Sequence, residues 1–576
     1  MKILGFNCFG HDSAVALIDK NEIVFAIEEE RLSRKKHDGS FPKLALNACL
    51  ENTNTSSNDI KHIAFFWNPK LSILNIPVYF LKFWNKVPSL LKEQKDFSIE
   101  ENLGMINYLK QMFLLPKKIR TLYNLPTSSF KFHYVNHHLC HAASAYYPSN
   151  FTNAAILTID GAGEWATTML AEGKGATIKK LHTINTPYSV GAFYQAIAIH
   201  LGFKLIEGPG KLMGLASYGN KESEAYFKLK NVITLLPNGK YSFDMSYFSY
   251  HYTRKSGVTQ KFNDLFGTSK RIAENWSEHE LNLAAAAQRV VEDIVLHLVT
   301  YLKQKTNSEN LCLAGGVALN SVSNGIIAKS GLFKNIYIQP AAGDSGTALG
   351  AALYVHHIKL KQPRIQPMQT AFLGIGYSDQ SIEDTICFFK LKYKKLEDIA
   401  LTQFAATAIN TNKIVAWFQG KDEFGPRALG NRSILANPTH PKMKDILNER
   451  VKFRESFRPF AAMVTQEDCG TYFDFDYPNP YMLLVYNVKE NYTEKLPSIT
   501  HIDGTCRIQT VNEQENPKIY NLLCELKKLN GFPIVVNTSF NIKGEPIVSS
   551  PTDAIESFLS ADIDFLILGN YVLSKN

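Results

Sequence analysis

Short apolar runs that end in glycine-rich or acidic loops, each followed by a helical pattern, most constrain what this chain can fold into. AAILTID ends at Asp160 and GAGEW, LCLAGG closes on Gly315 and Gly316, and NIYIQP leads into AAGDSGTALG. Strands that alternate with helices in this way predict an α/β sheet. Because functional groups in such sheets gather at the carboxyl ends of strands, we expect these loops to carry the chemistry.

The length of the chain predicts more than one such domain. A single hydrophobic core rarely organises 576 residues. The segment 357–369 is basic, contains proline and lacks periodicity, which is typical of a linker. We therefore predict a first domain at 1–356 and a second at 370–576. Helical periodicity at 69–130 predicts an insertion in the first domain.

Composition and charge exclude several classes of protein. The net charge of +9 is spread thinly and no long basic run is present, so no nucleic-acid arm is expected. The eight cysteines are scattered without a C-x-x-C pair, which indicates a reducing cytoplasm. The most apolar inner stretch, from Leu71, is interrupted by Pro77 and Lys82 and is too short to span a bilayer. We expect a cytoplasmic protein with no membrane or nucleic-acid partner.

Three histidines crowd the motif NHHLCHAASAYYPS. His137 and His141 stand four residues apart, so on a helix they would share one face and could bind one metal ion. Asp160 and Asp344 could add oxygen donors, and such a mixed shell suits Fe(II), Mn(II) or Zn(II) better than Mg(II). Two alternatives stay open. In one the histidines are satisfied core residues, and in the other His138 replaces His137.

Five motifs together resemble one known family. GFNCFGHDSAVALI, EEERLSRKKHDGSFP, NHHLCHAASAYYPS, ILTIDGAGEW and AGGVALN look, in order and spacing, like those of the NodU/CmcH carbamoyltransferases. The resemblance runs from residue 1 to the C-terminus. It implies an enzyme that attaches carbamoyl groups to hydroxyls of natural products. It also implies an actin/Hsp70-like (ASKHA) ATPase fold in the first domain and a YrdC-like α/β fold in the second.

The resemblance implies site residues in the first domain. A bound iron or similar divalent metal is expected on His137, His141, Asp160 and Asp344. ATP, with Mg as its counter-ion, is expected near the glycine loops. The residues expected to contact this nucleotide are Lys36, Gly161, Gly163, Glu207, Gly315, Gly316 and Asn320, with Arg427 from the second domain.

The pair His11-Asp12 is expected to be catalytic. A histidine near its ordinary pKa can take a proton from a hydroxyl at neutral pH. The alternative is a turn that His11 merely caps.

Cationic side chains gather in several motifs of the second domain. Guanidinium and ammonium groups suit a phosphate dianion, and amide or hydroxyl groups could bind a carbamoyl group. The resemblance implies that carbamoyl phosphate binds Lys452, Arg458, Arg507, Asn537 and Ser539. Arg432 and Arg454 are interpreted as supporting charge. For any one arginine, the alternative is a surface salt bridge.

The expected function is O-carbamoyl transfer from carbamoyl phosphate, through an ATP-dependent carbamoyladenylate, to a hydroxyl of a small-molecule acceptor. A tRNA threonylcarbamoyladenosine-type transferase is the main alternative, and the lack of basic RNA-binding stretches disfavours it. A non-catalytic nucleotide-binding module is the third. Aromatic and polar residues at 69–130 and around 220–275 are expected to line the acceptor cleft. The acceptor and the oligomeric state, a homodimer included, are left open.

Overall fold

A computed structural model gives the chain as two compact units. The first unit comprises Met1–Glu29 and His37–Met368, and the second comprises Glu30–Lys36 and Gln369–Asn576. The structure describes residues 1–84, 105–253, 257–268, 275–475 and 477–575. The predicted first domain included residues 30–36, whereas the structure groups this segment with the second unit.

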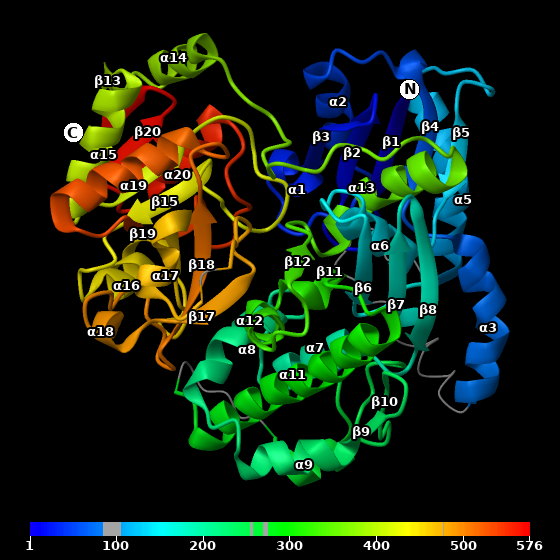
Figure 1. Cartoon of the computed structure of the whole chain (residues 1–576). Helices are drawn as coiled ribbons and strands as arrows, with labels where there is room; N and C mark the ends of the chain where they lie inside the picture. Colours follow the sequence, from blue (N-terminus) through cyan, green and yellow to red (C-terminus); the bar gives the residue numbers. More distant parts are fainter. Residues whose placement is uncertain (85–104, 254–256, 269–274, 476, 576) are drawn as a thin grey trace. The chain divides into compact units, whose positions relative to one another are not determined.

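Two five-stranded sheets of the same topology form the first unit (Figure 1). The first sheet has the order β3 (Glu22–Glu28), β2 (Ala14–Asp19), β1 (Lys2–Asn7), β4 (Ile60–Phe65), β5 (Lys131–Tyr134). The second has the order β8 (Thr177–Asn185), β7 (Ala166–Lys174), β6 (Asn153–Ile159), β11 (Asn310–Ala314), β12 (Asn335–Ile338). In each sheet the first two pairings are antiparallel and the last two are parallel. This duplicated α/β arrangement agrees with the predicted actin/Hsp70-like fold.

Two helices connect the duplicated halves. Helix α6 (His137–Tyr146) follows the last strand of the first sheet but packs against β6, β7 and β11 of the second. Helix α13 (Asp344–Tyr354) follows the last strand of the second sheet but packs against β1, β2 and β4 of the first. The two helices also pack on each other, and a Cβ at Gly350 would lie 1.8 Å from the carbonyl oxygen of Cys140. Only glycine permits this close approach of two backbones.

The remaining elements of the first unit surround these two layers. The helices are α2 (Lys43–Asn52), α3 (Pro69–Phe83), α5 (Met105–Leu122), α7 (Val190–His200), α8 (Gly208–Leu215), α9 (Glu224–Val232), α10 (Gln260–Phe266), α11 (Glu278–Thr306) and α12 (Ser321–Lys329). A separate hairpin joins β9 (Ile233–Leu236) to β10 (Lys240–Phe243). Helices α3 and α5 lie in the predicted insertion, whose residues 85–104 fall outside the described part.

The predicted linker begins as a structured element of the first unit. A π-helix spans Val355–Lys359. Beyond it, the backbone N–H of Gln366 donates to Asn21 and that of Met368 donates to Pro148. The chain is therefore fixed to the first unit as far as the boundary between the units.

A nine-stranded mixed sheet organises the second unit. Its order is β13 (Tyr393–Lys395), β21 (Tyr571–Ser574), β20 (Phe565–Leu568), β14 (Val415–Phe418), β15 (Arg432–Ala436), β19 (Ile534–Ser539), β16 (Ala461–Thr465), β18 (Thr505–Val511), β17 (Leu484–Asn487). Its helices are α14 (Asp379–Phe388), α15 (Asp398–Asn410), α16 (Met443–Ile446), α17 (Cys469–Tyr472), α18 (Glu490–Thr493), α19 (Pro517–Asn530) and α20 (Pro551–Ser560). Helices α15 and α19 pack together, and their apolar residues form one buried core with Trp417, Met463 and Val535 of the sheet. The predicted α/β class is confirmed here too, while the YrdC-like relationship stays a prediction.

Helix α1 (Glu29–Ser33) and the residues after it belong with this second sheet. Arg31 is 1% exposed and donates to the carbonyl of Gly425 at 2.6 Å. Arg34 donates to Ile547 at 2.8 Å and pairs with Asp553 at 3.4 Å. These contacts explain why an N-terminal segment is grouped with residues more than 390 positions away.

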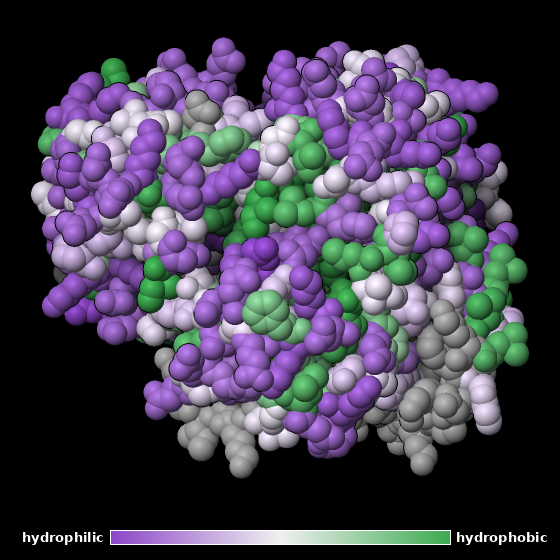
Figure 2. Space-filling view, turned by 60° about the horizontal axis from the view of Figure 1, so that its bottom comes forward, coloured by the Kyte–Doolittle hydropathy of each residue, from purple (hydrophilic) through white to green (hydrophobic). Residues whose placement is uncertain are grey.

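The surface is mostly hydrophilic on the face shown in Figure 2, with smaller apolar areas between the polar side chains. On α3 several apolar residues are exposed, Leu74 and Leu81 at 70% and 81%. Even so, none of the helices among the described residues is both long enough and apolar enough to cross a lipid bilayer.

Candidate metal and anion sites

Four side chains from three elements of the first unit converge on one point. His137 and His141 lie on the first turns of α6, Asp160 follows the last residue of β6, and Asp344 is the first residue of α13. One ligand atom from each lies within 4.8 Å of the others. The duplicated fold explains this meeting, because α6 and α13 cross between the two sheets.

The histidine nitrogens face one carboxylate oxygen. His137 Nε2 and His141 Nε2 lie 3.0 and 2.9 Å from Asp160 Oδ2, and 3.2 Å from each other. They lie 3.8 and 3.9 Å from Asp344 Oδ1. Among the described residues, both buried Nδ1 atoms lack a hydrogen-bond partner. The polar contacts of the two rings are therefore made by their Nε2 atoms, which face Asp160. A cation bound there could replace the protons on Nε2.

The charges at this point are strongly coupled. Burial opposes ionisation of Asp160, but hydrogen bonds from His137 and His141 outweigh it and hold the pKa of Asp160 well below its ordinary value. Burial raises the pKa of Asp344, and the nearby charge of Asp160 adds to that rise. Two imidazoles and two carboxylates in one buried site form a mixed N/O donor set that fits a divalent transition metal.

His11 lies at the exposed side of the same site. Its Nε2 is 3.9 Å from Asp344 Oδ2, its Nδ1 is 2.9 Å from Asp12 Oδ2, and its side chain is 45% exposed. Asp12 adopts a left-handed φ of 57°, and its other oxygen lies 2.7 Å from His37 Nδ1. Burial lowers the pKa of His11, but Asp344 and Asp12 outweigh this effect and raise it overall. The predicted pair is thus brought to the four ligand residues, and His37 is a partner that the sequence analysis missed.

His138 is turned away from this point. Its Nδ1 lies 2.7 Å from the Thr158 hydroxyl and its Nε2 lies 3.0 Å from the Ala166 carbonyl. Burial, with His137 and His141, lowers its pKa to about 3. The open alternative in which His138 replaces His137 is wrong, because both of its nitrogens are already used to join α6 to the strands beneath.

Four of the glycines predicted to contact the nucleotide lie beside the candidate metal ligands. Gly161 and Gly316 direct their backbone N–H groups at Asp160 Oδ1, at 2.7 and 3.3 Å. Gly163 packs its backbone against the rings of His137 and His138. Gly315 has a φ of 92°, and a Cβ there would lie 2.2 Å from the Ile159 carbonyl oxygen. These glycines allow the backbone to approach Asp160 closely.

Two further residues predicted to contact the nucleotide have local structural roles. Asn320 caps α12 through Ser323 and exchanges hydrogen bonds with Gln288. Glu207 lies 3.7 Å from Lys211 one turn later in α8. Their contact with a nucleotide stays a prediction.

In the second unit, like charges are brought together. Three neighbouring strands align Arg507, Ala461 and Asn537, so that Arg507 and Asn537 share one face with a small residue between them. Burial, together with Arg507 and Arg458, lowers the pKa of Arg427 well below its ordinary value. Burial also lowers the pKa of Arg507, to about 10. Among the described residues, the buried Nε atoms of Arg427 and Arg507 have no hydrogen-bond partner.

Lys452 lies beside these arginines. It donates to the Ser539 hydroxyl at 3.3 Å and to Asn541 Oδ1 at 3.0 Å. Burial is the main cause that lowers its pKa well below the ordinary value, and Arg454, Arg458 and Lys36 add to it. The residues predicted to bind phosphate therefore lie close together. Lys36, which was predicted to contact the nucleotide in the first domain, belongs to the second unit, and its charge lowers the pKa of Lys452.

Asn537 points an unused acceptor toward the same face. Its Nδ2 donates to Ala428 at 3.0 Å and to Gln509 Oε1 at 2.9 Å, which fixes the orientation of the amide. Its buried Oδ1 has no donor among the described residues. A ligand with an N–H group could satisfy it.

Arg432 does not belong to the cationic group as predicted. Its Nε lies 2.9 Å from Asp422 Oδ1, and both side chains are fully buried. Its guanidinium also lies 3.6 Å from the centre of the Phe418 ring. Arg432 is therefore held in a buried ion pair of the scaffold.

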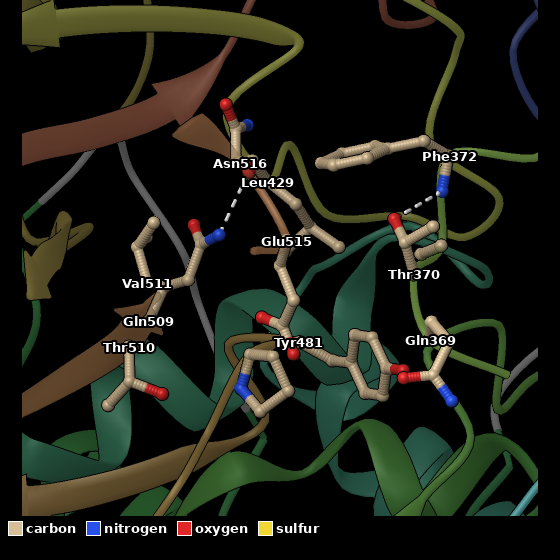
Figure 3. A pocket seen from close by; sticks show the side chains of 12 residues that line it. Gln369, Thr370, Phe372, Leu429, Tyr481, Gln509, Thr510, Val511, Glu515 and Asn516 are labelled. Atoms are coloured by element: carbon tan, nitrogen blue, oxygen red, sulfur yellow. Dashed lines mark hydrogen bonds between the residues drawn. The ribbon is translucent and has the colours of Figure 1, made fainter. Parts of the chain in front are cut away.

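A small pocket with a cavity volume of about 20 Å³ lies close to this face (Figure 3). Phe372, Leu429 and Tyr481 give it apolar walls, while Gln509 and Glu515 add polar groups. Gln509 joins it to Asn537, because its Nε2 donates to Leu429 at 2.8 Å and its Oε1 accepts from Asn537.

Comparisons with known proteins show relatives along the whole chain. Residues 2–353 match the family model described as "Carbamoyltransferase N-terminus", and residues 406–575 match "Carbamoyltransferase C-terminus". An uncharacterized protein of Synechocystis is 39% identical over 600 residues, covering 100% of this chain and 96% of its own length. Nodulation protein NolNO of Sinorhizobium fredii is 34% identical over 578 residues, covering 99% of this chain and 80% of its own.

Two solved structures show a distant likeness. Component A of (R)-2-hydroxyglutaryl-CoA dehydratase from Acidaminococcus fermentans shares 14% identity at a TM-score of 0.34, covering 62% of this chain and 97% of its own. Full-length HypF shares 15% identity at a TM-score of 0.28, covering 45% and 51%.

Proposed function

The chain belongs to the carbamoyltransferase family, and from that premise we propose that it moves the carbamoyl group of carbamoyl phosphate to a hydroxyl of a small-molecule natural product, with ATP as co-substrate. The observation that carries the proposal is the group of buried cations Arg427, Arg507 and Lys452 beside the unused Asn537 Oδ1 in the second unit; among the described residues, the Nε atoms of Arg427 and Arg507 have no hydrogen-bond partner. Carbamoyl phosphate offers a dianion for the cations and an amide N–H for the asparagine. Few other small metabolites offer both in so compact a form.

Lys452, Arg458 and Arg507 would bind the phosphate, with Ser539 and Asn537 on the carbamoyl end. Charge-assisted bonds to a dianion replace the mutual repulsion of these cations. Cleavage of carbamoyl phosphate by water gives carbamate and phosphate. A carbamate oxygen then attacks the α-phosphorus of ATP, and pyrophosphate leaves with the broken bond. Arg427 would neutralise charge on the nucleotide, and the resulting carbamoyladenylate has a good leaving group.

Transfer to the acceptor would take place in the first unit. Asp12 accepts a hydrogen bond from His11 Nδ1, which orients the ring. Because the pKa of His11 is raised, its Nε2 takes the hydroxyl proton only in the fraction of the enzyme whose imidazole is neutral, and that fraction grows as pH rises. The acceptor oxygen attacks the carbamoyl carbon, and AMP leaves. His137, His141, Asp160 and Asp344 would hold Fe(II) or a similar ion, which supplies Lewis-acid polarisation when bound. The glycine loops around Asp160 would accommodate the nucleotide.

The test is product analysis with carbamoyl phosphate and a panel of hydroxylated acceptors, with and without ATP. Carbamate ester, AMP and pyrophosphate are expected in equal amounts. Full turnover without nucleotide would remove the adenylate step. Failure to consume carbamoyl phosphate with any acceptor, and failure to bind it in calorimetry, would overturn the donor assignment.

A further inference from the structure

The N-terminus of helix α6 is closed by a buried carboxylate from another loop. Glu164, 8% exposed, accepts from the backbone N–H of His137 at 3.1 Å to Oε1 and 3.2 Å to Oε2. The first N–H groups of a helix lack partners within the helix, and a negative charge there complements its dipole. Helix α6 has no acidic residue in its own first turn. The charge that completes this helix therefore comes from the loop after Asp160.

The same carboxylate holds two more segments. Its Oε2 accepts from the side-chain amide of Asn136, the N-cap of α6, at 2.8 Å. Its Oε1 accepts from the backbone N–H of Asn68, the N-cap of α3, at 2.8 Å. The neighbouring Trp67 ring lies 5.3 Å from the His137 ring. One side chain thus joins the ligand helix, the Asp160 loop and the start of the helical insertion.

We propose that Glu164 is a positioning residue that sets His137 and His141 against Asp160 and ties the start of α3 to the ligand helix. The inference rests on the metal site of the proposed function. Every polar contact of this carboxylate is with a donor, so both oxygens are needed as acceptors. In Glu164→Gln one oxygen becomes an NH₂ group, which in either orientation faces a donor: the NH₂ group of Asn136 or the backbone N–H of Asn68.

This geometry permits an exchange of donor and acceptor. Asn136→Asp alone keeps the oxygen that caps Leu139 but places a second carboxylate against Glu164. In the double variant Glu164→Gln/Asn136→Asp, the introduced amide can donate to the introduced carboxylate. Its remaining oxygen can still accept from Asn68 and His137. Only a direct contact between positions 136 and 164 predicts that two harmful substitutions repair each other.

The experiment measures metal content after dialysis against a chelator, and the absorption spectrum of the Co(II)-loaded protein. Glu164→Gln is expected to lower metal affinity roughly 10- to 100-fold, as for other groups that orient metal ligands. Asn136→Asp should do the same, and the double variant should recover most of the loss and the wild-type spectrum. Glu172→Gln is the matched control, because Glu172 lies on the following strand and pairs with Lys174 at 2.7 Å. It should bind metal as the wild type does.

The outcomes separate this inference from the one on which it rests. If the wild type retains no metal, the proposed metal site itself fails. If the wild type retains metal while Glu164→Gln has the same affinity and spectrum, the positioning role is wrong. A double variant no better than the sum of the single ones would also overturn it. Thermal unfolding of each metal-free variant identifies any variant that does not fold. For the variants that fold, we expect a decrease in kcat with a smaller change in KM.

Discussion

In the first unit the charged side chains of the site face partners of opposite sign, whereas in the second unit most of the cations lie beside other cations, with Glu455 3.9 Å from Arg458. His137, His141 and Asp160 lie within hydrogen-bond distance of each other. Arg427, Arg458 and Arg507 are gathered without an acidic group among the causes that shift the pKa of Arg427. One site is close to electrically balanced before any ligand binds, and the other is not.

The difference predicts how each site responds to its ligand. Balanced groups keep their geometry in the ligand-free protein, so the first site should select a cation by shape and donor type. Gathered cations cost stability until an anion arrives, so the second site should gain stability when it binds. Removing a group from the first site should therefore lower the free energy of unfolding of the ligand-free protein, whereas removing a cation from the second site should leave it unchanged or raise it.

The largest effect is expected for His141→Ala. The substitution removes one of two nitrogen donors and leaves Asp160 with a single histidine partner in a buried site. We expect metal content to fall below one-tenth of the wild type, and carbamoyl transfer to fall at least roughly 100-fold, because even groups that only orient metal ligands give 10- to 100-fold effects. Metal analysis and initial rates check this. Full metal content in the variant would contradict the ligand assignment.

The next prediction concerns the second site: Arg507→Gln should bind carbamoyl phosphate more weakly, with an unchanged or raised free energy of unfolding. Losing one charge from a buried charge pair costs about 2–5 kcal/mol of binding, so affinity for carbamoyl phosphate should fall by roughly 30- to several-thousand-fold. Removing it also relieves repulsion among the remaining cations. Calorimetry and thermal unfolding measure the two quantities.

Two other arginines serve as controls for this prediction. Arg450→Gln removes an exposed guanidinium 3.6 Å from Asp562 and should change neither quantity. Arg432→Met breaks the fully buried pair with Asp422 and should cost about 3–5 kcal/mol of stability. If Arg507→Gln destabilises the protein as Arg432→Met does, the contrast between balanced and gathered charge is wrong.

The smallest effect is proton uptake on anion binding. The pKa of Lys452 is lowered well below 10.5, so the folded protein binds fewer protons than the unfolded chain and becomes more stable as pH rises toward 10.5. A bound phosphate raises this pKa again, and binding should take up at most about one proton. Calorimetry in buffers of different ionisation enthalpy measures it. Lys452→Met should abolish the uptake, and equal uptake in this variant would assign it elsewhere.

Sequence patterns predicted the α/β class and indicated that His137, His141, Asp160 and Asp344 could share a site, and they located the cationic motifs without showing that these converge. These features follow local rules: strand ends carry acidic or glycine loops, and helical spacing places two histidines on one face. The resemblance to a known family supplied the roles that spacing leaves open.

Other features depend on contacts that no local pattern records. Arg432 looks like its neighbours in sequence, and only the fold shows that Asp422 holds it. Residues 30–36 read as part of the first domain, yet Arg31 and Arg34 bind carbonyls far along the chain. Glu164 stands in the motif GAGEW, where its acidic side chain was the signal. The helix that it completes could not be identified without the packing.

The contact of Gly350 with Cys140 has a mechanical consequence. It is a pivot with no room for even a methyl group, and it lies within two helical turns of the ligand side chains on both α6 and α13. If the two sheets rock about such a pivot, displacement grows with distance from it, so the ligand atoms move least and the outer strands move most. Any relative motion of the two sheets about this contact would therefore leave the spacing of the four ligands nearly constant.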